Sequence, residues 1–347
     1  MRKILMKMIG VILIASMWAV MIPQLAEASN TDMKQHVFAD GGTKIGEATL
    51  AHLIYSAVFT NLAGNTLMNE PVKELPYEKE FNDAVVWFNN QQKEEWTSHY
   101  EADGIKKKLR ALYLKNPNNT KKTMILAHGV GGSTNMGPWA KLFYDNGYNI
   151  LLPQSRSYGE SEGDAGKNIS LGWLEREDYI NWIHLADKEN GLDSEIALMG
   201  ASMGSTAVLL ASGQDLPKSV KAIIADCGFT SHKALIQTIL QKIPFGGVIN
   251  KEKMYQLINQ ELFEKQNFKL EDASTTREVA KSKIPTLIIH GTGDQLFPVA
   301  MAQDIYQALG GEKELYLVEG GPHFKSIAKD LPNYTSRVNN FVNKFIK

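Results

Sequence analysis

The sequence lacks the features that identify several common classes of protein. It has one cysteine, Cys227, among 347 residues, so an intrachain disulfide is excluded. It contains neither a C-x-x-C nor an H-E-x-x-H pattern, so no metal site is indicated. Lysine and arginine together number 37 and the acidic residues 38, which leaves a formal net charge of -1. Neither nucleic acid nor an anionic surface is therefore indicated as a partner.

The composition of the sequence is typical of a globular protein. It is 44% hydrophobic and 22% charged, and no internal repeat or low-complexity tract is visible. Its length fits one large domain, or one domain with an appended segment, and is ample for a hydrophobic core.

The N-terminus is typical of an exported protein. A basic start at residues 1–7 precedes an uncharged, mostly apolar run at 8–22 and a small-x-small pattern at 26–28. We expect a signal peptide over 1–28, cleaved before Ser29, and a secreted or cell-surface location. The alternative is an uncleaved segment that associates the protein with the membrane, although the run is short beside the roughly 20 residues that span a bilayer.

Residues 29–96 are expected to form a partly helical N-terminal extension. Helical patterns cover about 48–62 and about 78–96. Packing on the main domain is the role expected for such amphipathic helices, and a membrane-facing or substrate-gating role is the alternative.

From Thr97 onward the pattern changes to that of a sheet. An Asp103-Gly104 pair predicts a hairpin turn, and apolar runs then alternate with helical stretches as far as Ala225. Such alternation predicts a parallel sheet covered by helices on both faces, with ligands bound at the carboxyl ends of its strands.

A helical, apolar-rich insert at about 229–282 interrupts this alternation, and the sheet resumes at Thr286. We expect the insert to form a cap on a domain that covers 97–347. Its apolar residues could form the core of the cap itself or line an acyl pocket, since cores and pockets have similar linings.

One stretch predicts a catalytic turn. Residues 196–211 read as a strand, G-x-S-x-G and a helix, with Ser202 at the centre. Gly200 and Gly204 remove side chains that would collide with the neighbouring strand and helix, and the helix aims its N-terminal dipole at the space above Ser202. A second match, centred on Ser161, has neither a preceding strand nor a following helix, so we interpret it as a loop.

A serine nucleophile needs a base and a group that orients the base. His323 is the best candidate base, because its Gly-rich loop follows the last apolar strand. Asp294 lies in a Gly-rich turn after a strand, Asp226 ends another strand, and either could be the acid.

The loop 128–132, which follows another apolar run, contains three glycines. Its turn could let the N–H groups of Val130 and Met203 form an oxyanion hole. A phosphate-binding loop is the alternative, but the P-loop lysine is missing. His128 is expected to be structural.

The chain order Ser202, Asp294, His323, together with the glycine loop and the capped sheet, resembles the α/β-hydrolase family over about 97–347. The resemblance favours Asp294 over Asp226. It implies an α/β-hydrolase fold, in which helices flank a mostly parallel central sheet with a helical cap insert, and it implies a triad, a two-amide oxyanion hole and no cofactor. Residues 224–229 and the loop after Leu152 are similar to exported or membrane-anchored Gram-positive cell-surface hydrolases.

One loop departs from the family pattern. Related chains read D-x-R-G-x-G-x-S after the fourth strand, whereas Gln154 stands here for the Asp and Ser157 for a Gly. This departure concerns the packing of the loop and leaves the triad intact.

The expected function is that of an exported serine esterase that cleaves carboxylic esters through an acyl-Ser202 intermediate. The expected substrate is a small, uncharged ester with an apolar acyl or aryl group. A serine peptidase or amidase is the alternative within enzymes, and a non-catalytic binding protein on a hydrolase fold is the alternative from another class.

Overall fold

The computed structural model describes residues 46–63, 74–164, 167–242 and 250–347. The predicted signal peptide, 1–28, and the start of the N-terminal extension lie outside these ranges. The described residues divide into two compact units, of which the smaller holds 46–58, 236–242 and 250–269. Within the described ranges, no helix combines the length and apolarity needed to cross a bilayer.

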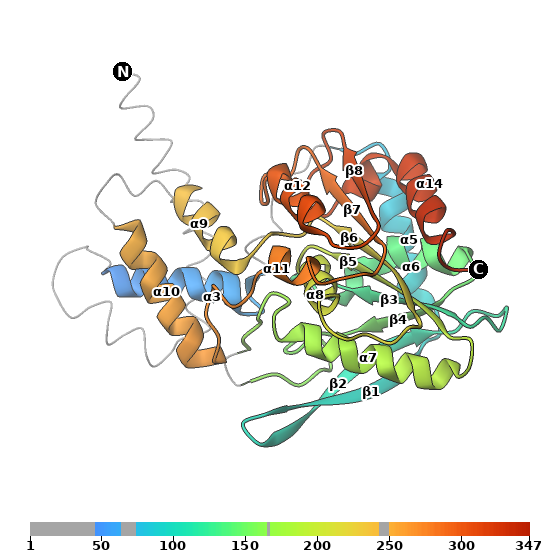
Figure 1. Ribbon diagram of the computed structural model, residues 1–347, viewed down its shortest axis with the longest axis horizontal. Helices are drawn as coiled ribbons and strands as arrows, with labels where there is room; N and C mark the ends of the chain where they lie inside the picture. The colour runs from blue at the N-terminus through green and yellow to red at the C-terminus, as the bar shows by residue number, and fades with distance from the viewer. Residues whose placement is uncertain (1–45, 64–73, 165–166, 243–249) are drawn as a thin grey trace. The chain divides into compact units, whose positions relative to one another are not determined.

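The larger unit is built on a single eight-stranded sheet (Figure 1) with the strand order β1-β2-β4-β3-β5-β6-β7-β8. Its strands are β1 (Glu94–Ala102), β2 (Ile105–Leu114), β3 (Lys122–Ala127), β4 (Asn149–Pro153), β5 (Glu195–Ala201), β6 (Val220–Asp226), β7 (Thr286–Gly291) and β8 (Lys313–Val318). The β1–β2 and β2–β4 pairs are antiparallel and the other pairs are parallel. The mostly parallel sheet predicted from the sequence is confirmed.

The hairpin turn predicted at Asp103-Gly104 is also confirmed. Ala102 pairs with Ile105, and the two residues between them have φ angles of 53° and 71°. The sheet begins at Glu94, three residues before the predicted start of the domain, because β1 pairs with β2 along its whole length.

Helices cover both faces of the sheet (Figure 1). One face carries α5 (Glu78–Asn90), α6 (Gly137–Asp145), α13 (Ser326–Lys329) and α14 (Leu331–Val342); the other carries α7 (Glu175–Asn190), α8 (Met203–Ala211), α11 (Thr275–Val279) and α12 (Val299–Ala308). Side chains of a strand alternate between faces, so Met124 and Leu126 of β3 enter one core while Ile125 and Ala127 enter the other. The near-continuous apolar runs of the sequence reflect this two-sided burial.

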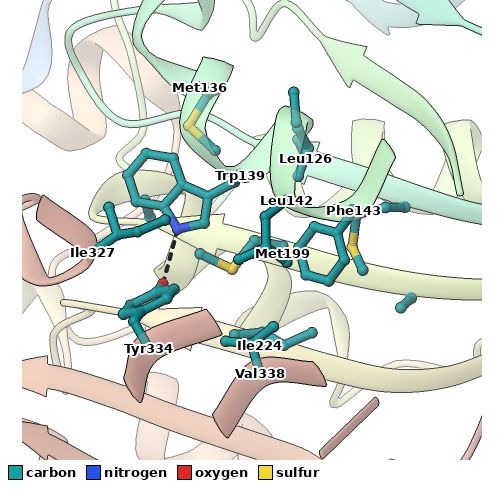
Figure 2. Close-up of a cluster of buried hydrophobic side chains, with 14 of the residues drawn as sticks. Leu126, Met136, Trp139, Leu142, Phe143, Met199, Ile224, Ile327, Tyr334 and Val338 are labelled. Carbon is teal, nitrogen blue, oxygen red and sulfur yellow. Dashed lines mark hydrogen bonds between the residues drawn. The ribbon is translucent and has the colours of Figure 1, made fainter. Parts of the chain in front are cut away.

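The core under α6 and α14 contains a polar link (Figure 2). The indole N–H of Trp139 donates to the hydroxyl of Tyr334 at 2.8 Å, among buried side chains that include Met199 and Ile224. The Tyr334 hydroxyl in turn donates to Asp226 Oδ2 at 2.9 Å. This chain ties the two helices to the carboxyl end of β6.

The smaller unit is helical. It contains most of α3 (Glu47–Phe59), the end of α9 (His232–Lys242) and all of α10 (Lys251–Gln266). Asn250 caps α10 by accepting from Lys253 N at 3.1 Å, and His52 contacts Glu261 at 2.7 Å across the unit. The two helices of the predicted N-terminal extension fall in different units, because α5 buries Phe81, Ala84 and Phe88 in the core of the larger one.

Candidate active site

Ser202 occupies the sharp turn between β5 and α8. Its backbone has φ 56° and ψ -119°, a strained conformation for a residue with a side chain. A Cβ atom at Gly204 would lie 1.9 Å from the carbonyl oxygen of Ala127, and one at Gly200 would lie 2.3 Å from that of Gly204. The spacing of the two glycines is therefore a steric requirement of the turn.

The structure brings the three predicted side chains into one hydrogen-bonded chain. Ser202 Oγ lies 2.9 Å from His323 Nε2, and His323 Nδ1 lies 2.8 Å from Asp294 Oδ2. The imidazole is 6% exposed and the carboxylate fully buried. A hydroxyl, an imidazole and a carboxylate in this order can pass a proton from the serine to the histidine.

The Asp294 carboxylate is fixed from its own loop. Its Oδ1 atom accepts from the backbone N–H groups of Leu296 and Phe297, each at 2.9 Å. Burial alone would raise the pKa of this carboxyl, but hydrogen bonds from His290 and His323 hold it well below its usual range. In the folded protein, the Asp294 carboxyl is therefore ionised at neutral pH.

His290 is a residue of this site that the sequence analysis did not single out. It lies at the end of β7, fully buried, with Nε2 at 3.2 Å from Asp294 Oδ2 and 3.0 Å from the carbonyl oxygen of Phe297. Its position four residues before Asp294 was the available signal, but a histidine in an apolar strand is also typical of a core position.

Asp226, the other candidate acid, has a different environment. Its Oδ2 atom accepts from Tyr334, and within the described residues its Oδ1 atom has no hydrogen-bond partner. Burial raises the pKa of Asp226 to about 6. The backbone carbonyl oxygen of Asp226 contacts the catalytic turn, because it accepts a hydrogen bond from Ser202 N at 2.9 Å.

The glycine loop after β3 lies against the serine. A Cβ atom at Gly129 would be 3.3 Å from Ser202 Cβ. Val130, the next residue, is buried, and Met203 is the first residue of α8, where backbone N–H groups have no partner within the helix. The oxyanion hole formed by these two amides stays a prediction.

His128 has the structural role expected of it. It is fully buried, with Nδ1 at 2.7 Å from the carbonyl oxygen of Gly129 and Nε2 accepting from Ser155 N at 2.9 Å. Because the carbonyl fixes the proton on Nδ1, the ring is a neutral link between two loops, and burial lowers its pKa to about 4.

The loop after β4 shows how the departure from the family pattern is accommodated. The Gln154 side chain accepts from Glu160 N at 2.8 Å, and Arg156 makes a two-point ion pair with Asp178 at 2.6 and 2.8 Å. Ser161 donates to the Gln154 carbonyl at 2.6 Å and accepts from Arg110 N at 2.9 Å. The second G-x-S-x-G match therefore holds a loop together, as its context indicated.

Comparisons with known proteins agree with this architecture. A family model described as alpha/beta hydrolase fold matches residues 122–247. An esterase of Pyrococcus furiosus superposes with a TM-score of 0.55 at 21% identity, over 74% of this chain and 92% of the esterase. The chain has the alpha/beta hydrolase fold. At 21% identity that structural likeness shows the fold alone.

Two further proteins are similar to this chain, one in sequence and one in structure. The uncharacterized protein YqkD of Bacillus subtilis (strain 168) is 29% identical over 230 residues, which are 65% of this chain and 72% of YqkD. An acylaminoacyl peptidase of Pyrococcus horikoshii superposes with a TM-score of 0.54 at 17% identity, over 76% of this chain and 44% of the peptidase. At 17% identity the likeness to the peptidase also shows the fold alone.

Proposed function

We propose that this protein is a serine esterase that cleaves carboxylic esters through an acyl-Ser202 intermediate. The observation that carries the proposal is the chain of two hydrogen bonds from Ser202 through His323 to the buried Asp294. The esterase of the same fold supports it.

Each residue has a defined part in the proposed reaction. His323 Nε2 accepts the Ser202 proton as Oγ attacks the ester carbonyl carbon, and Asp294 stabilises the resulting imidazolium. The N–H groups of Val130 and Met203 donate to the carbonyl oxygen as it becomes an anion. His323 then protonates the departing alcohol, and a water molecule releases the acid from Ser202 by the same steps in reverse order.

Aromatic side chains around the base favour an uncharged substrate. The Phe297 ring meets the His323 ring edge to face at 4.8 Å, and Phe229 meets Phe297 at 5.2 Å. Both phenylalanines are buried. We infer a small ester with an apolar acyl or aryl group as the substrate class.

An amide is the second candidate substrate. The same His323 that protonates an alcohol could protonate a leaving nitrogen, and the acylaminoacyl peptidase has the same fold. Parallel assays with the p-nitrophenyl esters and p-nitroanilides of one acyl group would compare the two directly.

The deciding experiment measures hydrolysis of p-nitrophenyl esters from acetate to decanoate by a protein that begins at Ser29. We expect Ser202→Ala to lower kcat by about 10³-fold or more, because the nucleophile is removed. Ser161→Ala is the matched control, since it alters the other G-x-S-x-G serine, and it should keep activity in the folded fraction. If wild type and Ser202→Ala are equally inert to the esters, the anilides and a fluorophosphonate probe, a binding protein on this fold replaces the enzyme.

We also propose that the protein is exported, on the basis of residues 1–28 of the sequence. N-terminal sequencing of the protein from an expressing bacterium would test this. A mature chain that starts at Ser29 supports cleavage, and an intact N-terminus in the membrane fraction supports an anchor.

A further inference from the structure

Two imidazoles share one oxygen atom of Asp294. His323 Nδ1 lies 2.8 Å from Oδ2, and His290 Nε2 lies 3.2 Å from the same atom. The second carboxylate oxygen is occupied by the backbone N–H groups of Leu296 and Phe297. His290 is therefore the only side chain besides His323 for which the described structure gives a polar contact with this carboxylate.

The surroundings of His290 decide which of its nitrogens bears a hydrogen. Its Nε2 atom faces two acceptors, the Asp294 carboxylate and the Phe297 carbonyl at 3.0 Å. Neither acceptor can donate, so Nε2 must be the N–H in the neutral ring as well as in the charged one. The single Nε2–H of His290 is therefore shared between the Phe297 carbonyl and the Asp294 carboxylate at any pH at which the protein is folded.

Backbone contacts join the loops that carry Asp294 and His323. A Cβ atom at Gly291 would lie 2.0 Å from the carbonyl oxygen of Gly321, so the two segments of backbone are in direct contact there. Thr292 N donates to Val318 at 2.9 Å, and Gly293 N donates to Gly321 at 3.0 Å. None of these backbone contacts involves Asp294 Oδ2, which His290 contacts directly.

We propose that His290 is a positioning residue of the catalytic site, which holds Asp294 Oδ2 in the orientation that His323 requires and takes a share of its negative charge. The inference rests on the proposed function in that it assigns Asp294 to the orientation of His323. A donor at Oδ2 competes with the His323 N–H for the same lone-pair density, so it weakens the preference of the carboxylate for the imidazolium form of His323. Removal of His290 should strengthen that preference.

Three titratable groups face His290, of which the two carboxylates favour its cation and a protonated His323 opposes it. They are Asp294 on the loop after β7, Asp226 at the end of the adjacent β6, and His323 from the loop after β8. Burial would lower the pKa of His290, but the hydrogen bond and charge of Asp294 outweigh burial and raise it. Whether neutral or charged, His290 draws negative charge away from His323.

Two substitutions separate the donor from the rest of the side chain. His290→Leu removes the donor at similar bulk, whereas His290→Gln can place its amide N–H near the position of Nε2. His232→Gln is the control, because His232 is also fully buried and its Nε2 contacts a carbonyl oxygen, that of Ser170, at 2.7 Å. Thermal unfolding of all three variants measures the purely structural cost.

The readouts are kcat and the midpoint of the acidic limb of kcat/KM for p-nitrophenyl butyrate. For His290→Leu we expect kcat to fall about 10-fold or more, and the acidic midpoint to rise by about 0.5 to 1 pH unit. His290→Gln should recover most of kcat, and His232→Gln should leave the midpoint unchanged. If His290→Leu matches wild type in midpoint and kcat, or if only its melting temperature changes, the inference is wrong.

A second measurement does not depend on turnover. In protein labelled with 13C at the histidine rings, the His323 signal is assigned by its loss in His323→Gln, and its pH-titration midpoint is compared between wild type and His290→Leu. A higher midpoint in the variant supports the inference even if no ester is cleaved, which would refute the proposed function alone. Equal midpoints in an active esterase would refute the role of His290 alone.

Discussion

His323 Nε2 lies 2.9 Å from Ser202 Oγ, although 121 residues separate the two in the chain. The contact is a consequence of the parallel sheet, because Ser202 follows β5 and His323 follows β8, and the carboxyl ends of parallel strands lie at one edge. The geometry of the sheet therefore brings together a nucleophile and a base that are far apart in the sequence.

The choice between the two candidate acids can be tested directly. Asp294→Asn should lower kcat by about 10⁴-fold, because an amide in contact with His323 Nδ1 favours the wrong tautomer of the imidazole. Asp226→Asn should keep most of the activity, since the hydrogen-bond partner of Asp226 in the described structure is Tyr334. Ester hydrolysis by the two purified variants measures the difference, and equal losses would refute the assignment.

This choice also shows what could be predicted from sequence. Ser202 and His323 could be placed because each lies in a glycine-containing turn after a strand, which is a topological argument. Asp226 ends one strand and Asp294 follows another. The same argument therefore fits both, and only the resemblance to a family separated them. In the structure the difference is local, because backbone amides of Leu296 and Phe297 fix the Asp294 carboxylate, whereas the partner given for the Asp226 carboxylate in the described residues is the Tyr334 hydroxyl.

His290 and the loop after β4 mark where prediction from sequence stopped. A histidine in an apolar strand gives no sign of whether its ring meets a carboxylate or a carbonyl, and His290 meets both. The pairing of Arg156 with Asp178 joins a loop to α7 across a gap in sequence that no spacing rule specifies. Such contacts depend on the final packing of the side chains.

Gly204 is predicted to tolerate no side chain. In Gly204→Ala the new Cβ would meet the carbonyl group of Ala127, a backbone atom that cannot swing away, so we expect a loss of about 3 kcal/mol or more in the free energy of unfolding. Gly46→Ala is the control, because a Cβ there would meet nothing within 4 Å. Urea denaturation of both variants gives the comparison, and similar stabilities would contradict the steric account of the turn.

The Arg156–Asp178 pair is predicted to matter far more than an exposed ion pair. The Asp178 side chain is 4% exposed, and Asp178→Ala would leave the Arg156 guanidinium buried without its partner. We expect a loss of about 3 to 5 kcal/mol in the free energy of unfolding. Asp145→Ala, which breaks the exposed pair with Lys141, should cost less than about 1 kcal/mol. Losses of the same size would show that the buried pair contributes no more than a surface one.

Asp226 should make the protein less stable as the pH rises from acid to neutral. Burial raises its pKa from 3.8 to about 6, so the folded state holds the proton more tightly than the unfolded chain does. The stability that this proton contributes is complete below about pH 4 and is lost as the pH rises through 6, a change of about 3 kcal/mol. Asp226→Asn cannot lose a proton, so its free energy of unfolding relative to wild type should increase by about that amount between pH 4 and pH 7.

Tyr334→Phe should change the free energy of unfolding in the opposite direction over the same pH range, because the Tyr334 hydroxyl stabilises the charged Asp226 carboxylate. Urea denaturation at the two pH values measures both variants, and a difference from wild type that does not change with pH would refute this account of Asp226.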